Sequence, residues 1–195
     1  MGVDADRFRE FERTAHDRLS QSYHEFFTPV TALALDGLLG SFDIKPGLRV
    51  LDVACGPGGV AAALRRRCAC VTGIDLAPGM VALTSRLNPG IELREGNVEA
   101  LPFPDKSFNA AVCNFGLGHF PRSEVASANA FACLRQVEQP LFLGGIFRNG
   151  SEFRGFFARR LPRSALLRRT TCHKAIRCSD FRITSNFNGY WKVAV

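Results

Sequence analysis

The sequence predicts an α/β fold, a doubly wound and mostly parallel sheet preceded by N-terminal helices. Short apolar runs rich in β-branched residues alternate with helix-forming segments from residue 48 to residue 115. A glycine-rich turn, CGPGG, follows the first of these runs and leads into a helix-forming segment. This alternation is typical of βαβ units, in which ligands bind beyond the carboxyl ends of the strands. The sequence therefore predicts a site built from residues 54–58, 75–77, 97–99 and 114–119.

Local patterns define the individual elements. Apolar residues at three- and four-residue steps predict an amphipathic helix over residues 4–23. A second helix is expected to begin at Thr28-Pro29, with Thr28 as its N-cap, and to end at Gly40. The alternating region is expected to contain strands at 48–54, 70–75, 91–96 and 107–115, with helices at 60–67 and 78–87.

The pattern weakens after Pro121. Residues 122–136 favour a helix, and residues 140–147 favour a strand that two glycines weaken. Residues 181–195 have β-like content and an Asn-Gly turn signal, which predicts a terminal hairpin. Between them, residues 151–169 are rich in Arg and Phe and have no clean period.

The composition is that of one globular domain in a reducing compartment. The chain has 195 residues, 46% of them apolar, and a chain of this size buries enough surface to fold without disulfides or metals. No apolar run approaches the length of a membrane span, and the charged N-terminus lacks the apolar core of a signal peptide. Seven scattered cysteines suit a cytosolic protein better than a disulfide framework. We therefore expect a cytoplasmic location.

The net charge of +7 is unevenly distributed. Residues 1–121 carry 12 Lys and Arg against 14 Asp and Glu, whereas residues 122–195 carry 13 against 4. A basic tail can bind nucleic acid or an acidic surface, because Arg attracts phosphate and aromatic rings stack on bases. This tail contains no recognisable nucleic-acid-binding module, so we do not expect a nucleic-acid partner.

Residues 56–61 match the pattern G-x-G-x-x-A directly after an expected strand. The pattern alone fits a dinucleotide-binding site and sites for other adenosyl ligands. Asp52, four residues before Gly56, would repel a pyrophosphate but attract a ligand with a cationic amino group. Asp75, 19 residues after Gly56, stands where a carboxylate accepts hydrogen bonds from ribose hydroxyls. Structural alternatives stay open, with Asp75 as a helix N-cap and Asp52 as a turn residue at the strand end.

Together these segments resemble the class I S-adenosylmethionine-dependent methyltransferases. The similarity is closest to the small-molecule group that includes ubiquinone/menaquinone-biosynthesis-type enzymes. VLDVACGPGG looks like the first motif of that family and GIDLAPGMV like the second. GNVEALPFPDKSFNAAVCNFGLGHFP looks like the third and fourth motifs run together. These matches cover residues 45–121.

The resemblance implies a Rossmann-like methyltransferase sheet with S-adenosylmethionine as its cofactor. Asn97 stands where the family usually has Asp, and it would accept from the adenine amino group through an uncharged carbonyl oxygen. Tyr23 and Phe27 would belong to a lid, although core packing explains them equally well. His119 is the candidate general base, with a structural role as the alternative. The cofactor-binding residues are then expected to be Asp52, Ala54, Gly56, Gly58, Asp75, Leu76, Met80, Asn97, Val98 and Asn114.

The resemblance stops in the last third of the chain. Family members continue with an Arg-Val-Leu-x-Pro-Gly-Gly turn before the fifth strand, and a β-hairpin completes their sheet. The corresponding stretch here, residues 123–145, lacks that turn. We therefore divide the chain into an N-terminal helical lid (1–44), a cofactor-binding core (45–121) and a divergent basic segment (122–195). One hypothesis is that the last segment is read in another frame or from an alternative exon, leaving the C-terminal strands divergent or incomplete.

The expected function is S-adenosylmethionine-dependent methyl transfer to a small-molecule acceptor by in-line displacement. Two alternatives stay open. The first is a catalytically impaired cofactor-binding or regulatory protein. The second is an NAD-dependent oxidoreductase, favoured by G-x-G-x-x-A but disfavoured by Asp52 and by the motif over residues 96–121. No metal site is expected, because the cysteines and the histidine near them lack the paired spacing typical of zinc sites: Cys68, Cys70, Cys172, His173 and Cys178.

Overall fold

The computed structural model describes three stretches of the chain with their side chains, residues 4–40, 44–67 and 69–135. Beyond them it describes the backbone of four strands, 141–148, 152–159, 182–185 and 191–194. The cluster at Cys172, His173 and Cys178 lies outside the described residues, as does Cys68. The described cysteines are free thiols, namely Cys55, Cys70, Cys113 and Cys133.

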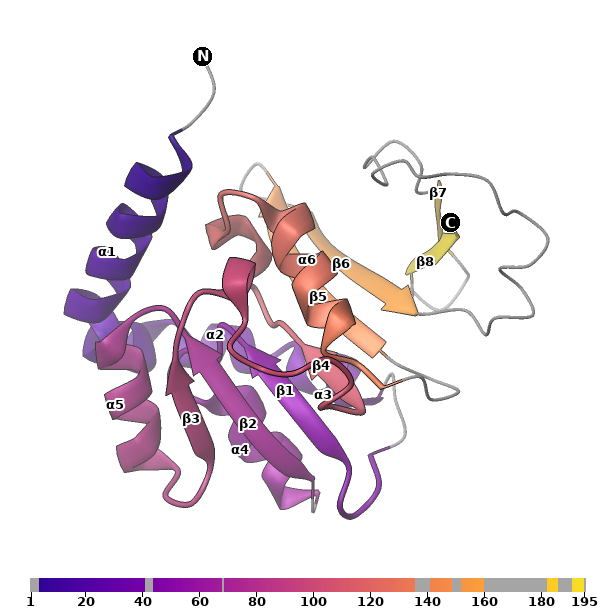
Figure 1. The fold of residues 1–195 in the computed structure, drawn as a ribbon, viewed down its shortest axis with the longest axis horizontal. Helices are drawn as coiled ribbons and strands as arrows, with labels where there is room; N and C mark the ends of the chain where they lie inside the picture. The colour runs from indigo at the N-terminus through magenta and orange to yellow at the C-terminus, as the bar shows by residue number, and fades with distance from the viewer. Residues whose placement is uncertain are drawn as a thin grey trace.

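A six-stranded sheet in the order β3-β2-β1-β4-β5-β6 forms the centre of the molecule (Figure 1). Neighbouring strands from β3 through to β5 pair in parallel, and β6 pairs antiparallel to β5. Strand order reverses between β1 and β4, and a ligand site is expected at such a switch point. The strands are β1 (Arg49–Val53), β2 (Cys70–Asp75), β3 (Glu92–Glu95), β4 (Ala110–Val112), β5 (Leu141–Arg148) and β6 (Glu152–Arg159).

Helices cover both faces of this sheet. The central strand β1 is buried on both faces, because Val50 packs in one apolar cluster and Leu51 in the other. The first cluster joins β1 to α3 and α4, and the second joins it to η1 and α6. The helices that follow the strands are α4 (Gly59–Arg66), α5 (Pro78–Leu87) and α6 (Ser123–Ala132), with short 3₁₀ turns η1 (Val98–Ala100) and η2 (Leu117–His119).

Three helices precede the sheet, namely α1 (Ala5–Phe26), α2 (Thr28–Ala32) and α3 (Leu35–Gly40). The α1 helix lies beside α5 at the edge of the molecule (Figure 1). The sequence predicted one helix from Thr28 to Gly40 with Thr28 as its N-cap. The N-cap is Phe27, so Thr28 already lies in the first turn, and the prediction of one helix is wrong at residues 33–34. There the N–H groups of Leu33 and Ala34 donate to carbonyls three residues back, which tightens the chain and ends α2. The turn lets Leu39 of α3 pack into the first apolar cluster.

The other predicted elements up to residue 136 are confirmed, and α5 has its predicted bounds. The β5 strand confirms the strand predicted at 140–147, and it occupies the fifth-strand position beside β4. The predicted terminal hairpin is present as β7 (Arg182–Ser185) paired with β8 (Trp191–Ala194), in a separate two-stranded sheet. The sequence missed β6, because its Arg- and Phe-rich residues lack a period of two. Among the described helices, none is long and apolar enough to cross a membrane.

Candidate functional site

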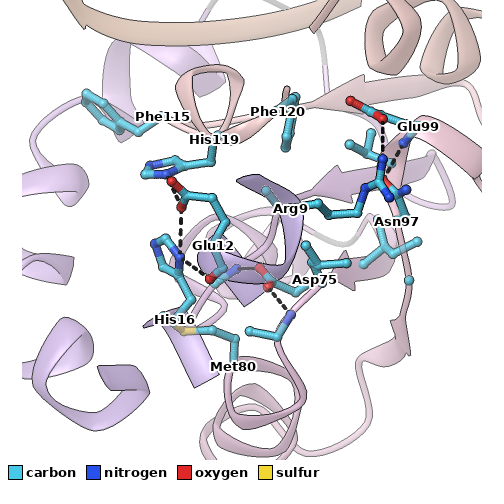
Figure 2. A pocket seen from close by; sticks show the side chains of 18 of the residues that line it. Arg9, Glu12, His16, Asp75, Met80, Asn97, Glu99, Phe115, His119 and Phe120 are labelled. Atoms are coloured by element: carbon cyan, nitrogen blue, oxygen red, sulfur yellow. Dashed lines mark hydrogen bonds and ion pairs between the residues drawn. The ribbon is translucent and has the colours of Figure 1, made fainter. Parts of the chain in front are cut away.

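A pocket lies beyond the carboxyl ends of β1, β2 and β4, next to α1 (Figure 2). We call it the strand-end pocket; it encloses about 760 Å³ of empty space, part of it open to solvent. A smaller pocket adjoins it and reaches Asp52. Most of the residues expected to form the site line the strand-end pocket, namely Tyr23, Ala54, Gly56, Asp75, Leu76, Met80, Asn97, Val98, Asn114 and His119.

The turn after β1 places main-chain atoms, rather than side chains, beside the pocket. Ala54, Gly56 and Gly58 all have positive φ angles, of 53°, 50° and 82°. A Cβ atom on Gly56 would have nothing within 4 Å, so the space in front of this residue is open. Gly58 lines neither pocket. A Cβ atom there would lie 2.5 Å from Cγ2 of Thr84, so Gly58 lets the start of α4 approach α5 closely.

Asp75 ends β2 and holds two turns together. Its Oδ2 accepts a hydrogen bond from the N–H of Gly56 at 2.8 Å, and its Oδ1 accepts from the N–H of Ala77 at 3.0 Å. Burial raises the pKa of Asp75, and hydrogen bonds from the backbone of Ala77, Gly56 and Leu76 oppose this rise. The N-cap of α5 is Ala77 rather than Asp75. A carboxylate offers about four acceptor sites, so Asp75 can still accept from a ligand beside these backbone donors.

Asp52 is a fully buried carboxyl group inside β1, not a turn residue at its end. The N–H of Ala61 in the first turn of α4 donates to this carboxylate. The other oxygen, Oδ2, is buried and has no hydrogen-bond partner among the described residues. Burial raises the pKa of Asp52 to about 8 from an ordinary 3.8. A buried acceptor without a partner is costly, so this oxygen is suited to a ligand that donates a hydrogen bond.

Two asparagines lie on either side of the strand-end pocket. Oδ1 of Asn97 accepts from the N–H of Glu99 at 2.9 Å and caps η1, which leaves one lone pair of that oxygen for a ligand. Nδ2 of Asn114 donates to the carbonyl of Thr31 at 3.3 Å and joins the end of β4 to α2. Both side chains are therefore fixed by the fold before any ligand binds.

Glu12 of α1 lies between two histidines at the mouth of the pocket. Figure 2 shows its carboxylate between the rings of His16 and His119. Oε2 of Glu12 is 2.9 Å from Nδ1 of His119 and 3.3 Å from Nδ1 of His16. Nδ1 of His16 also lies 3.0 Å from the carbonyl oxygen of Glu12, and the two imidazole rings meet edge to face. His119 is thus held by a carboxylate, an arrangement the sequence did not reveal.

A second charged group, around Glu99 of η1, connects α1 to the opposite side of the strand-end pocket. The Glu99 side chain is only 1% exposed and accepts from the backbone N, Nε and Nη2 of Arg122 at 2.7, 3.0 and 2.7 Å. Oε2 of Glu99, which accepts from Nε and Nη2 of Arg122, also accepts from Nη2 of Arg9 at 3.2 Å. Burial alone would raise the pKa of Glu99, but the hydrogen bonds from the two arginines hold it below its ordinary value.

Of the two expected lid residues, only Tyr23 reaches the site. It lines both pockets, and burial raises the pKa of its hydroxyl. Phe27 stacks on Tyr23 with ring centroids 5.3 Å apart, is 58% exposed and lines neither pocket. Three further residues of α1 line the strand-end pocket and were not expected from the sequence, namely Arg9, Glu12 and His16. Their three- and four-residue spacing was the available signal, because it places them on one face of α1.

Several known proteins that resemble this chain are methyltransferases. A model of the methyltransferase domain family matches residues 50–137. The demethylmenaquinone methyltransferase of Thermus thermophilus is 36% identical over 130 residues, covering 60% of this chain and 58% of that enzyme. A ubiquinone/menaquinone biosynthesis C-methyltransferase of Xanthomonas oryzae is 38% identical over 112 residues, covering 52% and 41%. The chain thus spans about half the length of these relatives.

Solved structures share the fold. The YcgJ protein from Bacillus subtilis superimposes with a TM-score of 0.54 at 27% identity, covering 58% of this chain and 50% of that one. Phosphoethanolamine N-methyltransferase 1 from Haemonchus contortus, in complex with S-adenosylhomocysteine, gives a TM-score of 0.63 at 15% identity and covers 85% and 40%. At that identity the second likeness concerns the fold alone.

In its fold, its strand-end pocket and these matches, the chain resembles the class I S-adenosylmethionine-dependent methyltransferases of the small-molecule type. This resemblance implies S-adenosylmethionine as the cofactor, and the matches do not favour an NAD-dependent oxidoreductase. The match to the methyltransferase domain family covers residues 50–137, somewhat less than half of the chain.

Proposed function

We propose that this protein transfers a methyl group from S-adenosylmethionine to a small-molecule acceptor at the mouth of the strand-end pocket. One observation carries the proposal: a buried, unpartnered carboxylate oxygen on Asp52 lies beside a glycine turn with open space in front of Gly56. A cationic amino group is the ligand chemistry that such an oxygen attracts. The amino-acid end of S-adenosylmethionine carries that group.

The residues around the pocket fit the rest of the cofactor. Asp75 would accept from the ribose hydroxyls through its free lone pairs. Asn97 would accept from the adenine amino group, and the buried side chains of Met80 and Val98 would pack against the ring. Bound here, the cofactor supplies a methyl group already activated by its sulfonium centre.

The chain's own contribution is positioning, exclusion of water and the handling of one proton. The α1 helix lines the pocket through Glu12 and His16, where a bound acceptor would lie under it. Because Nδ1 of His119 faces the Glu12 carboxylate at 2.9 Å, we assign the ring hydrogen to Nδ1. Nε2 is then left as the proton acceptor, and a carboxylate-held histidine is a suitable general base.

We propose an acceptor with an acidic ring hydroxyl, such as a hydroquinone. The relatives from Thermus and Xanthomonas are named as a demethylmenaquinone methyltransferase and a ubiquinone/menaquinone C-methyltransferase. Removing the hydroxyl proton would place negative charge on the ring carbons, so that one of them can take the methyl group as the methyl–sulfur bond of the sulfonium breaks. Loss of the hydrogen on that carbon as a proton would then restore the aromatic ring. We also propose a cytosolic location, supported by the free thiols of the described cysteines.

Two measurements test the proposal. Calorimetric titration with S-adenosylhomocysteine should show one site per chain, and an absence of binding would overturn the assignment of the cofactor. Transfer of label from methyl-labelled S-adenosylmethionine to a panel of hydroquinones, phenols and amines should favour the hydroquinones. In this assay, His119→Asn should lower the rate by about 100-fold with S-adenosylhomocysteine affinity unchanged. Cofactor binding without any transfer would instead support the catalytically impaired alternative.

A further inference from the structure

The cluster of Glu12, His16 and His119 contains more donor atoms than one proton acceptor requires. One donor atom from each side chain lies within 4.8 Å of the other two. In a tetrahedral zinc site with bonds of about 2.0–2.2 Å, neighbouring ligand atoms are about 3.3 Å apart. The distances from Oε2 of Glu12 to the two Nδ1 atoms, 2.9 and 3.3 Å, are already close to that value.

The cluster is built from two elements that the fold fixes to each other. Glu12 and His16 are four residues apart and lie on the same face of α1, whereas His119 ends η2 after β4. The position of α1 is held at two further points. Arg9 donates to Glu99 at 3.2 Å, and Oδ1 of Asp17 accepts from the N–H of Gly79 at 2.6 Å. The three donors are therefore brought together by the tertiary structure.

The three donor groups favour a transition metal of borderline softness, which accepts both nitrogen and oxygen ligands. Two imidazoles and one carboxylate are a donor set that Zn²⁺ accepts, whereas Mg²⁺ and Ca²⁺ favour oxygen ligands alone. All three side chains line the strand-end pocket, so the coordination position they leave open faces the pocket.

We propose that Glu12, His16 and His119 form a Zn²⁺ site at the mouth of the strand-end pocket, and that zinc bound there inhibits methyl transfer. The inhibition rests on the proposed function. A neutral histidine that binds the metal through Nδ1 carries its hydrogen on Nε2. His119 would then have no nitrogen left to accept the proton of the acceptor. This proposal departs from the sequence-based expectation that the chain has no metal site.

Cobalt(II) tests the site without measuring activity. The full chain, stripped of metal with a chelator, is titrated with Co²⁺ and followed by visible absorption and by proton NMR. The chain has four histidines, so individual imidazole signals can be followed. We expect one Co²⁺ per chain, no thiolate charge-transfer band, and paramagnetic shifts for His16 and His119 but not for His24. A thiolate band would place the metal at cysteines and overturn the proposal, as would an absence of binding.

Matched variants locate the metal. Glu12→Gln and His16→Gln should each weaken Co²⁺ affinity by about 100-fold, since loss of a ligand costs at least as much as loss of a group that orients one. His24→Gln, a substitution eight residues further along the same helix, should leave the affinity unchanged. Equal affinity in all variants would overturn the proposal. Binding of S-adenosylhomocysteine to each variant confirms that it is folded.

The effect on catalysis is a separate readout. Zn²⁺ should inhibit the wild-type enzyme, and His16→Gln should release that inhibition relative to its own zinc-free rate. If S-adenosylhomocysteine binds and methyl transfer occurs but no metal binds, the proposed function stands and this inference fails. If Co²⁺ binds at the cluster but S-adenosylhomocysteine does not bind, the metal site stands and the proposed function fails.

Discussion

The N–H of Gly56 donates a hydrogen bond to Oδ2 of Asp75 at 2.8 Å, so the turn after β1 is attached to the end of β2. These two strands are neighbours in the parallel part of the sheet. The carboxylate therefore does two things: it fixes the glycine turn and presents its remaining lone pairs to the pocket. A change at Asp75 should affect both stability and cofactor binding.

Asp75→Asn should reduce both quantities. An amide has one accepting oxygen instead of two, so either Gly56 or Ala77 loses its acceptor. Leaving a buried donor unsatisfied costs about 1–3 kcal/mol of unfolding free energy. Loss of charge-assisted hydrogen bonds to the ribose should lower the affinity for S-adenosylhomocysteine by about 10–100-fold. Urea unfolding and calorimetry measure the two effects, and Asp105→Asn, an exposed change, is the control. Unchanged affinity would remove Asp75 from the cofactor site.

Two glycine substitutions in the same turn should affect different properties: Gly56→Ala mainly cofactor binding, and Gly58→Ala mainly the free energy of unfolding. Gly56→Ala adds a methyl group to open space at φ 50°, so it should cost only about 1 kcal/mol of stability but block cofactor binding. Gly58→Ala places a Cβ atom 2.5 Å from Cγ2 of Thr84, so it should cost more stability. Unfolding free energies and S-adenosylhomocysteine titrations separate the two.

A second-site change tests the steric explanation for Gly58. Thr84→Ser removes the methyl group that Gly58→Ala would strike, while its hydroxyl can still donate to the carbonyl of Gly56. The double variant should therefore regain part of the stability that Gly58→Ala loses. A double variant that is no more stable than the single one would show that Cγ2 of Thr84 does not set the cost, which would then lie in the positive φ of 82° at Gly58 and in the contact with Nδ2 of Asn88 at 2.8 Å.

Asp52 should make stability fall as pH rises. Its pKa is about 8 in the folded protein and 3.8 ordinarily, so between these values the native state holds a proton that the unfolded state has released. Linkage then lowers the unfolding free energy across this range and has no further effect above about pH 8. Asp52→Asn cannot titrate, so its stability should fall less between about pH 5 and pH 8. Parallel urea curves of the two proteins give the comparison, and identical slopes would contradict it.

The same group should couple cofactor binding to proton release. A cationic amino group beside Asp52 favours the ionised carboxylate and lowers the raised pKa. Binding of S-adenosylhomocysteine near neutral pH should therefore release a proton from Asp52. Calorimetry in two buffers of different ionisation enthalpy measures that proton, and Asp52→Asn should abolish it. If the variant releases the same number of protons as the wild type, the source is another group.

Arg9 should control how tightly α1 is held over the pocket. Its hydrogen bond to the buried Glu99 crosses from α1 to η1, whereas Arg13 pairs with Glu10 within α1. Arg9→Ala should therefore speed amide hydrogen exchange over residues 5–26, with a change in global stability of about 1 kcal/mol or less. Arg13→Ala is the matched control and should leave exchange at the pocket side unchanged. Equal exchange in the two variants would contradict a holding role for Arg9.

The sequence predicted those features that depend on neighbouring residues. The α5 helix was predicted with its observed bounds, because Pro78 opens it and an apolar pattern continues to Leu87. The glycine turn and Asp75 were predicted from their spacing within one βαβ unit. Met80 was expected to contact the cofactor, and it lines the strand-end pocket.

Contacts between residues far apart in the chain could not be predicted in this way. Glu12 and His119 are 107 positions apart, and Arg9 and Glu99 are 90 apart. The apolar period of α1 predicted the helix correctly, but it did not show which of its residues face the pocket. Phe11 is 67% exposed and Leu19 57%, while Arg9, Glu12 and His16 line the pocket. Electrostatic pairing across the site, rather than burial of apolar area, decides how this helix docks.

The way in which α1 is held has a consequence for the binding and release of ligands. Within the described part of the chain, none of the residues of α1 is buried, and its links to the core are Arg9 to Glu99, Glu12 to His119, Asp17 to Gly79 and Gln21 to Arg86. Ions in solution screen attractions between exposed charges but leave apolar packing largely intact. The His119 side chain is 46% exposed, so its pairing with Glu12 is open to screening, whereas the pair of Arg9 with the buried Glu99 is screened less. The exchange of cofactor and product should therefore quicken with ionic strength as the Glu12 end of the contact weakens.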